Sequence, residues 1–128
     1  MIADAMIAGI RSMRPAVPSR DFGESKRFYS ARGFKLTDLG PTLAEARLGA
    51  HSFLLQDFYV TEYAKNFVMH MRVESADDWW AMIEPLALEK TFKVRSPRPP
   101  KLESWGLRVL CVFDPSDVLW QIASRPSI

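Results

Sequence analysis

The side chains best suited to chemistry in this 128-residue chain are two histidines and one cysteine, His51, His70 and Cys111. A structural zinc site needs about four Cys or His ligands, and a disulfide needs two cysteines. The composition therefore excludes a Cys/His zinc cluster and a disulfide within the chain. Cys111 lies inside the apolar stretch 107–113, which predicts an inert core thiol rather than a nucleophile.

The carboxylates show no spacing that is typical of a catalytic acid/base pair. Asp77 and Asp78 are adjacent, and they are explained by the start of a predicted helix, where negative charge is stabilising. The six glycines are scattered singly and form no phosphate-binding loop. The sequence thus carries no short catalytic motif.

The composition is that of one soluble, packed domain. A net charge of +2 with 48% hydrophobic and 12% aromatic residues excludes disorder, and it excludes a nucleic-acid binder that relies on strong positive charge. No stretch approaches the roughly 20 apolar residues of a membrane helix. Asp4 stands where a signal peptide would carry positive charge. We therefore expect a cytoplasmic protein with no nucleic-acid or membrane partner.

The first half of the chain predicts one helix and four strands. Asp21 is a suitable N-cap with Glu24 completing a capping box, and Gly33 is a suitable helix end. Residues 1–12 are expected to form a short helix or an arm, whose apolar side chains need a partner in this chain or another. The expected strands are 13–19, 34–39, 42–48 and 52–58, followed by a polar and aromatic connector, 59–66.

The second half predicts the same order of elements. In the strand 67–73 the residues alternate, so that Val68, His70 and Arg72 share one face. A helix capped by Ser75 or Asp77 runs to about Lys90, with Pro85 bending or interrupting it. The further expected elements are a strand 91–94, a proline-rich loop 96–104, strands 107–113 and 118–123, and a turn 114–117.

This repeated pattern predicts an α+β fold of two βαβββ modules within a single domain, 1–128. Its parts are an arm 1–12, module one 13–58, the connector 59–66 and module two 67–124. Two such half-sheets form a curled mixed sheet that encloses a concave groove, the usual place for a ligand.

Several segments together resemble the vicinal oxygen chelate superfamily of glyoxalases, bleomycin-resistance proteins and dioxygenases, and most closely its bleomycin-resistance branch. The usual Asp-Pro-Asp-Gly turn of the closing hairpin is Asp114-Pro115-Ser116-Asp117 here. The likeness covers residues 13–124. The segments that carry it are 18–22, Phe28-Tyr29, Gly33-Phe34, Leu48-Gly49 with 53–56, Trp105-Gly106 and 114–120.

The resemblance implies a homodimer in which the groove can be shared between subunits. In metal-dependent members four strand positions hold the ion. Here they are occupied by Arg14, Gln56 (or Leu55 in a shifted register), Val68 and Gln121. Because arginine repels a cation and valine has no donor, we expect no metal and no other cofactor.

We predict that the groove binds a small planar or acidic molecule. Its basic character fits poorly with a cationic drug such as bleomycin. Two assignments stay open: His70 can instead be a histidine bonded to a neighbour, and Trp105 can instead seal module two. Trp79 and Trp120 are expected in the core, and Trp80 at a subunit interface. The predicted ligand-binding residues are Arg14, Gln56, Phe58, His70, Arg72, Trp105, Arg108 and Gln121.

The function that follows is metal-free binding of a small molecule, such as a toxic or antibiotic compound, by a homodimer. One alternative is a metal-dependent lyase, isomerase or dioxygenase of the glyoxalase type with a rearranged site. Another is a dimeric scaffold with a vestigial groove. The missing metal ligands favour the binding protein over the enzyme.

Overall fold

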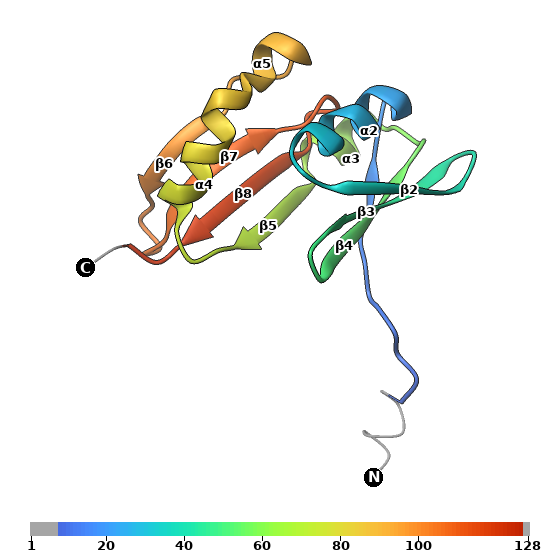
Figure 1. Ribbon diagram of the computed structural model, residues 1–128, viewed down its shortest axis with the longest axis horizontal. Helices are drawn as coiled ribbons and strands as arrows, with labels where there is room; N and C mark the ends of the chain where they lie inside the picture. The colour runs from blue at the N-terminus through green and yellow to red at the C-terminus, as the bar shows by residue number, and fades with distance from the viewer. Residues whose placement is uncertain (1–7, 127–128) are drawn as a thin grey trace.

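The protein consists of two four-stranded sheets, each covered on one side by helices, in a computed structural model that describes residues 8–126 (Figure 1). The first sheet has the order β1-β4-β3-β2, and the second β5-β8-β7-β6. The strands are β1 (Ala16–Pro18), β2 (Lys35–Gly40), β3 (Leu43–Leu48), β4 (His51–Gln56), β5 (Val68–Arg72), β6 (Arg98–Leu102), β7 (Arg108–Phe113) and β8 (Leu119–Ser124).

The two sheets have the same topology. In the first, β1 runs parallel to β4 and the remaining neighbours are antiparallel. In the second, β5 runs parallel to β8 and the remaining neighbours are antiparallel. The prediction of an α+β fold built from two βαβββ modules is confirmed.

The main helix of each module begins at the predicted residue. Asp21 caps α2 (Phe22–Ala31) by accepting a hydrogen bond from the Glu24 backbone N–H. Ser75 caps α4 (Ala76–Ile83) in the same way, accepting from the Asp78 N–H. Gly33 follows the end of α2 with φ +98°, a left-handed conformation that glycine adopts without steric cost.

Two predictions about helices need correction. The connector 59–66 contains a short helix, α3 (Thr61–Lys65), which has no side-chain cap and therefore gave no signal in the sequence. The helix expected up to Lys90 ends at Ile83, because Pro85 leads into a 3-10 turn, η1 (Glu84–Leu86). A second short helix, α5 (Leu88–Thr91), follows.

The strand expected at 91–94 is absent, and the predicted proline loop instead contains β6. Pro99 and Pro100 are tolerated there because β6 is the edge strand of its sheet and because its pairing with β7 skips both prolines. The pairing with β7 also shifts register between Arg98 and Lys101.

The N-terminal segment leaves the body of the molecule (Figure 1). The expected helix or arm at 1–12 lies partly outside the described residues. From Ala8 to Pro15 the chain has neither helix nor strand, and β1 covers only the middle of the predicted strand 13–19. None of the described helices is long and apolar enough to cross a membrane.

The two modules share one aromatic core. Tyr29 and Phe34 from module one pack against Trp120 from module two, with ring centroids 5.8 and 5.6 Å apart. Phe53 lies 5.4 Å from Trp120. Trp120 is buried as predicted, whereas Trp79 is only half-buried. The modules therefore meet through the sides of their sheets that carry the helices.

Candidate functional site

The face of each sheet that is turned away from its helices, called the open face below, carries most of the predicted site residues. Strand alternation sets this division, because neighbouring side chains point to opposite faces. In β3, Ala44 and Ala46 are buried while Glu45 and Arg47 are partly exposed. In β5, Val68, His70 and Arg72 are exposed while Met69 and Met71 are half-buried.

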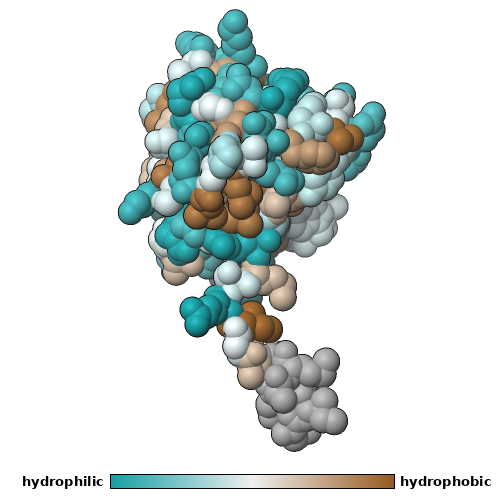
Figure 2. Space-filling view, turned by 90° about the vertical axis from the view of Figure 1, so that its right-hand side faces the viewer, coloured by the Kyte–Doolittle hydropathy of each residue, from teal (hydrophilic) through white to brown (hydrophobic). Residues whose placement is uncertain are grey.

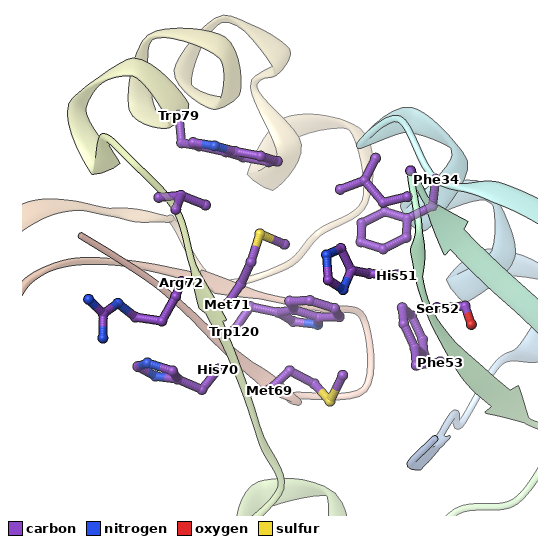
Figure 3. A pocket seen from close by; sticks show the side chains of 13 residues that line it. Phe34, His51, Ser52, Phe53, Met69, His70, Met71, Arg72, Trp79 and Trp120 are labelled. Atoms are coloured by element: carbon purple, nitrogen blue, oxygen red, sulfur yellow. The ribbon is translucent and has the colours of Figure 1, made fainter. Parts of the chain in front are cut away.

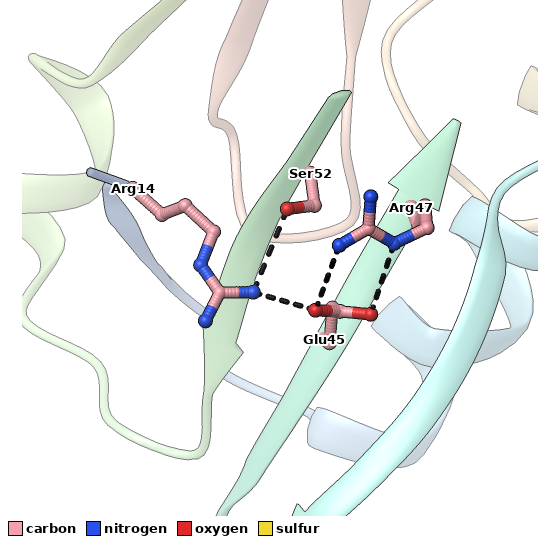
Figure 4. A network of polar contacts seen from close by, with 4 residues as sticks. All are labelled: Arg14, Glu45, Arg47 and Ser52. Carbon is pink, nitrogen blue, oxygen red and sulfur yellow. Dashed lines mark hydrogen bonds and ion pairs between the residues drawn. The ribbon is translucent and has the colours of Figure 1, made fainter. Parts of the chain in front are cut away.

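The open face of the first sheet holds two arginines that share one carboxylate (Figure 4). Arg14 Nη1 lies 2.6 Å from Glu45 Oε2 and 3.5 Å from Ser52 Oγ. Arg47 donates from Nε and Nη2 to the two Glu45 oxygens at 3.2 Å each. The hydrogen bonds from Arg47, and then from Arg14, hold the pKa of Glu45 below its usual value. The cluster has one more positive charge than negative.

Gln56 and Phe58 lie at the far end of this sheet. The Gln56 side-chain amide donates to the carbonyl of Ala16 on the neighbouring β1, at 3.5 Å. Phe58 follows β4 with an exposed ring, while its carbonyl accepts from the Ser19 N–H. Arg14, Gln56 and Phe58 thus belong to one sheet.

His70 and Trp105 lie together at the open face of the second sheet. His70 Nδ1 is 3.2 Å from Gln121 Oε1, and its ring centroid is 6.4 Å from that of Trp105. Trp105 is 53% exposed, so it does not seal module two. Arg72 is exposed on the same strand face, and no described carboxylate lies within ion-pair distance of it.

Sequence reasoning missed further charged residues of these faces. Arg95 and Arg98 stack over Phe113, with guanidinium carbons 4.2 and 5.4 Å from its ring centroid. Phe113 alternates with the core residue Val112, so its ring belongs to the open face. Glu45 and Arg47 were missed too. Their alternation with Ala44 and Ala46 along β3 is the sequence pattern that could have placed both on the open face.

The structure corrects the placement of Arg108, which was predicted to bind the ligand in the groove. Arg108 shares its face of β7 with the core residues Leu110 and Val112, so it lies on the helix side of the sheet and faces α4 instead. There its Nε and Nη2 each lie 2.8 Å from an Asp77 carboxylate oxygen. These bonds hold the pKa of Asp77 below its usual value. Arg108 is therefore an ion-pair partner of a helix start.

Within one chain the remaining predicted residues form two separate groups. Arg14, Gln56 and Phe58 belong to the first sheet, and no hydrogen bond or ion pair among the described residues joins them to the second group. Because the modules meet through their helix sides, the two open faces are turned away from each other. The second group is His70, Arg72, Trp105 and Gln121.

The residues at the four family metal positions do not fit a divalent ion. Arg14 is a permanent cation that is already paired with Glu45, and Val68 has no donor atom. Only the neutral amides of Gln56 and Gln121 remain, whereas a divalent site generally needs three protein ligands with imidazole or carboxylate among them. Within residues 8–126 no group of three or more His, Cys, Asp and Glu side chains is placed to hold a metal.

Cys111 was expected in the core, but it is half-buried and alternates with the core residues Leu110 and Val112, so it lies on the open face of β7, paired with Gln121. Burial raises the pKa of its thiol. The thiolate, which is the nucleophilic form, is disfavoured at neutral pH, as expected for an inert thiol.

A cavity of about 580 Å³ lies between the two modules on the helix side of the sheets (Figure 3). His51 is exposed at the start of β4, and its side chain lines this cavity. The lining residues are Phe34, Leu48, Gly49, His51, Ser52, Phe53, Met69, His70, Met71, Arg72, Val73, Trp79 and Trp120.

No known protein family and none of the curated proteins matches the sequence of the chain. Solved structures do match. A bleomycin-binding protein in complex with bleomycin is 18% identical, with 91% of this chain and 100% of that chain covered and a TM-score of 0.76. The chain has the bleomycin-resistance/glyoxalase fold.

Two further structures show how widely this bleomycin-resistance/glyoxalase fold is used. TnmS3, an antibiotic-binding protein from Streptomyces sp. CB03234, is 20% identical over 92% of this chain and 98% of that chain, with a TM-score of 0.69. A lactoylglutathione lyase from Agrobacterium tumefaciens is 13% identical over 90% and 94%, with a TM-score of 0.64. Because both a binding protein and a lyase share the fold, the activity of this chain must be argued from its own residues.

Proposed function

We propose that the protein is a metal-free small-molecule-binding protein of the bleomycin-resistance type that acts as a homodimer. The observation that carries the proposal is the division of the polar and aromatic site residues between two open faces that are turned away from each other. A second copy that sets the first sheet of one chain against the second sheet of the other would bring both groups around one groove. By symmetry such a dimer would contain two grooves.

Exposed apolar side chains support a second copy. Met13 is 88% exposed, Phe58 51% and Val68 48%. Figure 2 shows apolar atoms gathered in the middle of one face, above the point where the N-terminal segment leaves the body. Contiguous exposed apolar surface on a small protein is typical of an interface or a ligand site.

The charges of the open faces favour an acidic aromatic ligand. Arg14 and Arg47 outnumber Glu45 on the first sheet, and Arg72 is unpaired among the described residues of the second. Trp105 supplies an exposed aromatic surface beside His70. This combination complements a planar anion and repels a cationic drug. Binding of bleomycin and of an antibiotic by proteins of this fold supports sequestration of a toxic or antibiotic compound.

The metal-dependent alternative has the weaker support. A lyase shares the fold, but here the four positions that hold the ion in metal-dependent members carry a paired arginine, a valine and two neutral amides. A catalytic divalent ion generally has three protein ligands with imidazole or carboxylate among them. We therefore assign no catalytic residue.

Calorimetric titration with naphthalene-1,5-disulfonate, a flat dianion, tests the proposal. Wild-type protein is expected to bind it, and both Trp105→Ala and Arg72→Ala are expected to weaken binding at least tenfold. Arg108→Ala is the matched control, because it also removes a cation but lies on the other face, paired with Asp77. A loss in Arg108→Ala equal to that in Arg72→Ala would mean that only net charge matters. No binding by wild-type protein would favour a scaffold with a vestigial groove.

A further inference from the structure

The cavity between the modules is distinct from the two open faces. One wall consists of the helix-side residues of β5, Met69 and Met71, and the opposite wall of Phe34 and Phe53 from module one (Figure 3). The ring of Trp120 lines the cavity between these two walls, and the ring of Trp79 lies across one end of the cavity. All these side chains point away from the open faces.

A difference between the two modules explains why this space is left. In module one, α3 packs against β1, and Val17 of β1 is fully buried. In module two, α4 packs against β6, β7 and β8, and β5 has no comparably extensive contact with a described helix. Met69, Met71 and Val73 are consequently half-buried although they point toward the core. β1 and β5 occupy equivalent positions in the two sheets. The apolar side of β1 is covered, whereas the apolar side of β5 is partly exposed.

The lining favours a flat aromatic occupant. The volume of about 580 Å³ falls in the range of about 300–1,000 Å³ that is usual for small-molecule pockets. Indole and phenyl rings offer faces and edges for aromatic contact. The flexible thioethers of Met69 and Met71 can adjust to an aromatic ring and contact it favourably.

One polar side chain reaches this apolar space. The His51 ring lies between Met71 and Phe34 (Figure 3), and it has no hydrogen-bond partner among the described residues. Arg72 and His70 also line the cavity, but their side chains extend to the other side of β5 (Figure 3). Among the described residues that line the cavity, none therefore turns an arginine or carboxylate side chain into the apolar space. Arg32 is not a lining residue, but its guanidinium carbon lies 4.6 Å from the ring centroid of Trp120. A buried charge on a ligand would lack a partner here.

We propose that this cavity is a second binding site, which takes an uncharged bicyclic aromatic molecule with one hydroxyl or carbonyl group that bonds to His51. The site lies within one chain and does not depend on the shared groove. It differs from the groove in ligand class as well, because the Arg72 side chain is turned to the groove, whereas no described lining residue points a permanent charge into the cavity.

The test compares 2-naphthol with 2-methylnaphthalene, which has a similar shape but no hydroxyl, by calorimetric titration. Wild-type protein is expected to bind 2-naphthol more tightly than 2-methylnaphthalene. His51→Leu is expected to weaken 2-naphthol about three- to tenfold, as one lost hydrogen bond does, and to leave 2-methylnaphthalene nearly unchanged. Met71→Trp, which fills the cavity from β5, is expected to weaken both at least tenfold.

Leu48→Phe fills the same space from β3, so the test does not depend on the folding of one variant. Trp105→Ala serves as the groove variant and is expected to leave 2-naphthol binding unchanged while it weakens naphthalene-1,5-disulfonate. Loss of 2-naphthol binding in Trp105→Ala, with retention in Met71→Trp and Leu48→Phe, would overturn the proposal. So would the absence of 2-naphthol binding, or binding that disappears as the chain dimerises, since a second copy would then cover the cavity.

Discussion

The hydroxyl of Tyr29 donates a 2.7 Å hydrogen bond to the Asp114 carboxylate, and both side chains are buried. Tyr29 belongs to α2 of module one, and Asp114 begins the turn between β7 and β8 of module two. The same hydroxyl accepts a hydrogen bond from Trp120 Nε1 at 2.9 Å. The other Asp114 oxygen accepts from the backbone N–H groups of Ser116 and Val118. One buried network therefore fixes how the two modules sit against each other.

Tyr29→Phe should lower the free energy of unfolding by about 1–3 kcal/mol, because it leaves Asp114 and Trp120 each short of a buried hydrogen-bond partner. Urea denaturation followed by tryptophan fluorescence measures the change. Tyr63→Phe is the matched control, since Tyr63 is exposed and should change stability little. If the free energy of unfolding falls by the same small amount in both variants, the buried network does not hold the modules together.

Asp114 should make stability depend on pH in the acid range. Burial raises its pKa from the ordinary 3.8 to about 6, against the opposing effect of the hydrogen bond from Tyr29. Between about pH 4 and 6 the folded state therefore holds a proton that the unfolded state releases. The contribution of Asp114 to the free energy of unfolding rises as the pH falls through this window, by up to about 3 kcal/mol.

Asp114→Asn isolates this effect, because asparagine keeps an acceptor oxygen for Ser116 and Val118 but does not titrate. The stability of wild-type protein minus that of the variant should increase from pH 7 to pH 4. Denaturation curves at several pH values measure it. A difference that stays constant with pH would show that Asp114 titrates near its ordinary value.

Glu45→Gln should tighten the binding of naphthalene-1,5-disulfonate several-fold. In the wild-type protein the Glu45 carboxylate pairs with the guanidinium groups of Arg14 and Arg47. Removing its negative charge leaves both cations available to an anionic ligand. Calorimetric titration at low salt measures the gain, which should shrink as salt screens the charges. Weaker binding in the variant would mean instead that Glu45 is needed to position Arg14.

Metal removal should leave ligand binding unchanged. The donor set at the family positions lacks imidazole and carboxylate ligands, so protein dialysed against a chelator should bind the probe as untreated protein does. Elemental analysis of protein purified without added metal checks the same point. A stoichiometric amount of Ni, Zn, Fe or Mn in each chain would favour the metal-dependent alternative.

Much of the fold could be predicted because its signals are local. Asp21 and Ser75 cap their helices through side chains that the sequence shows directly, and the alternation around His70 gives the two faces of β5. The short helix α3 has no such cap. The strand β6 could not be predicted because Pro99 and Pro100 are typical of a loop. They are tolerated in a strand here because β6 lies at the edge of its sheet, which only the three-dimensional structure shows.

The site was less predictable because it depends on partners far apart in the sequence. His70 and Gln121 share one sheet face, as alternation indicated. Nothing local indicated that Arg108 would pair with Asp77, or that the two open faces would be turned away from each other. That orientation follows from the packing of Trp120 against Phe53 and Tyr29, and such contacts between modules have no signature in the sequence.

Subunit complementation tests most directly whether the groove is shared between two chains. Arg14→Ala removes a cation of the first sheet, and Arg72→Ala removes one of the second. Each variant alone should bind naphthalene-1,5-disulfonate weakly. When the two are unfolded together and refolded as a mixture, mixed dimers should contain one groove without either substitution, so about a quarter of all grooves should regain wild-type affinity. A mixture that binds no better than the separate variants would contradict the shared groove.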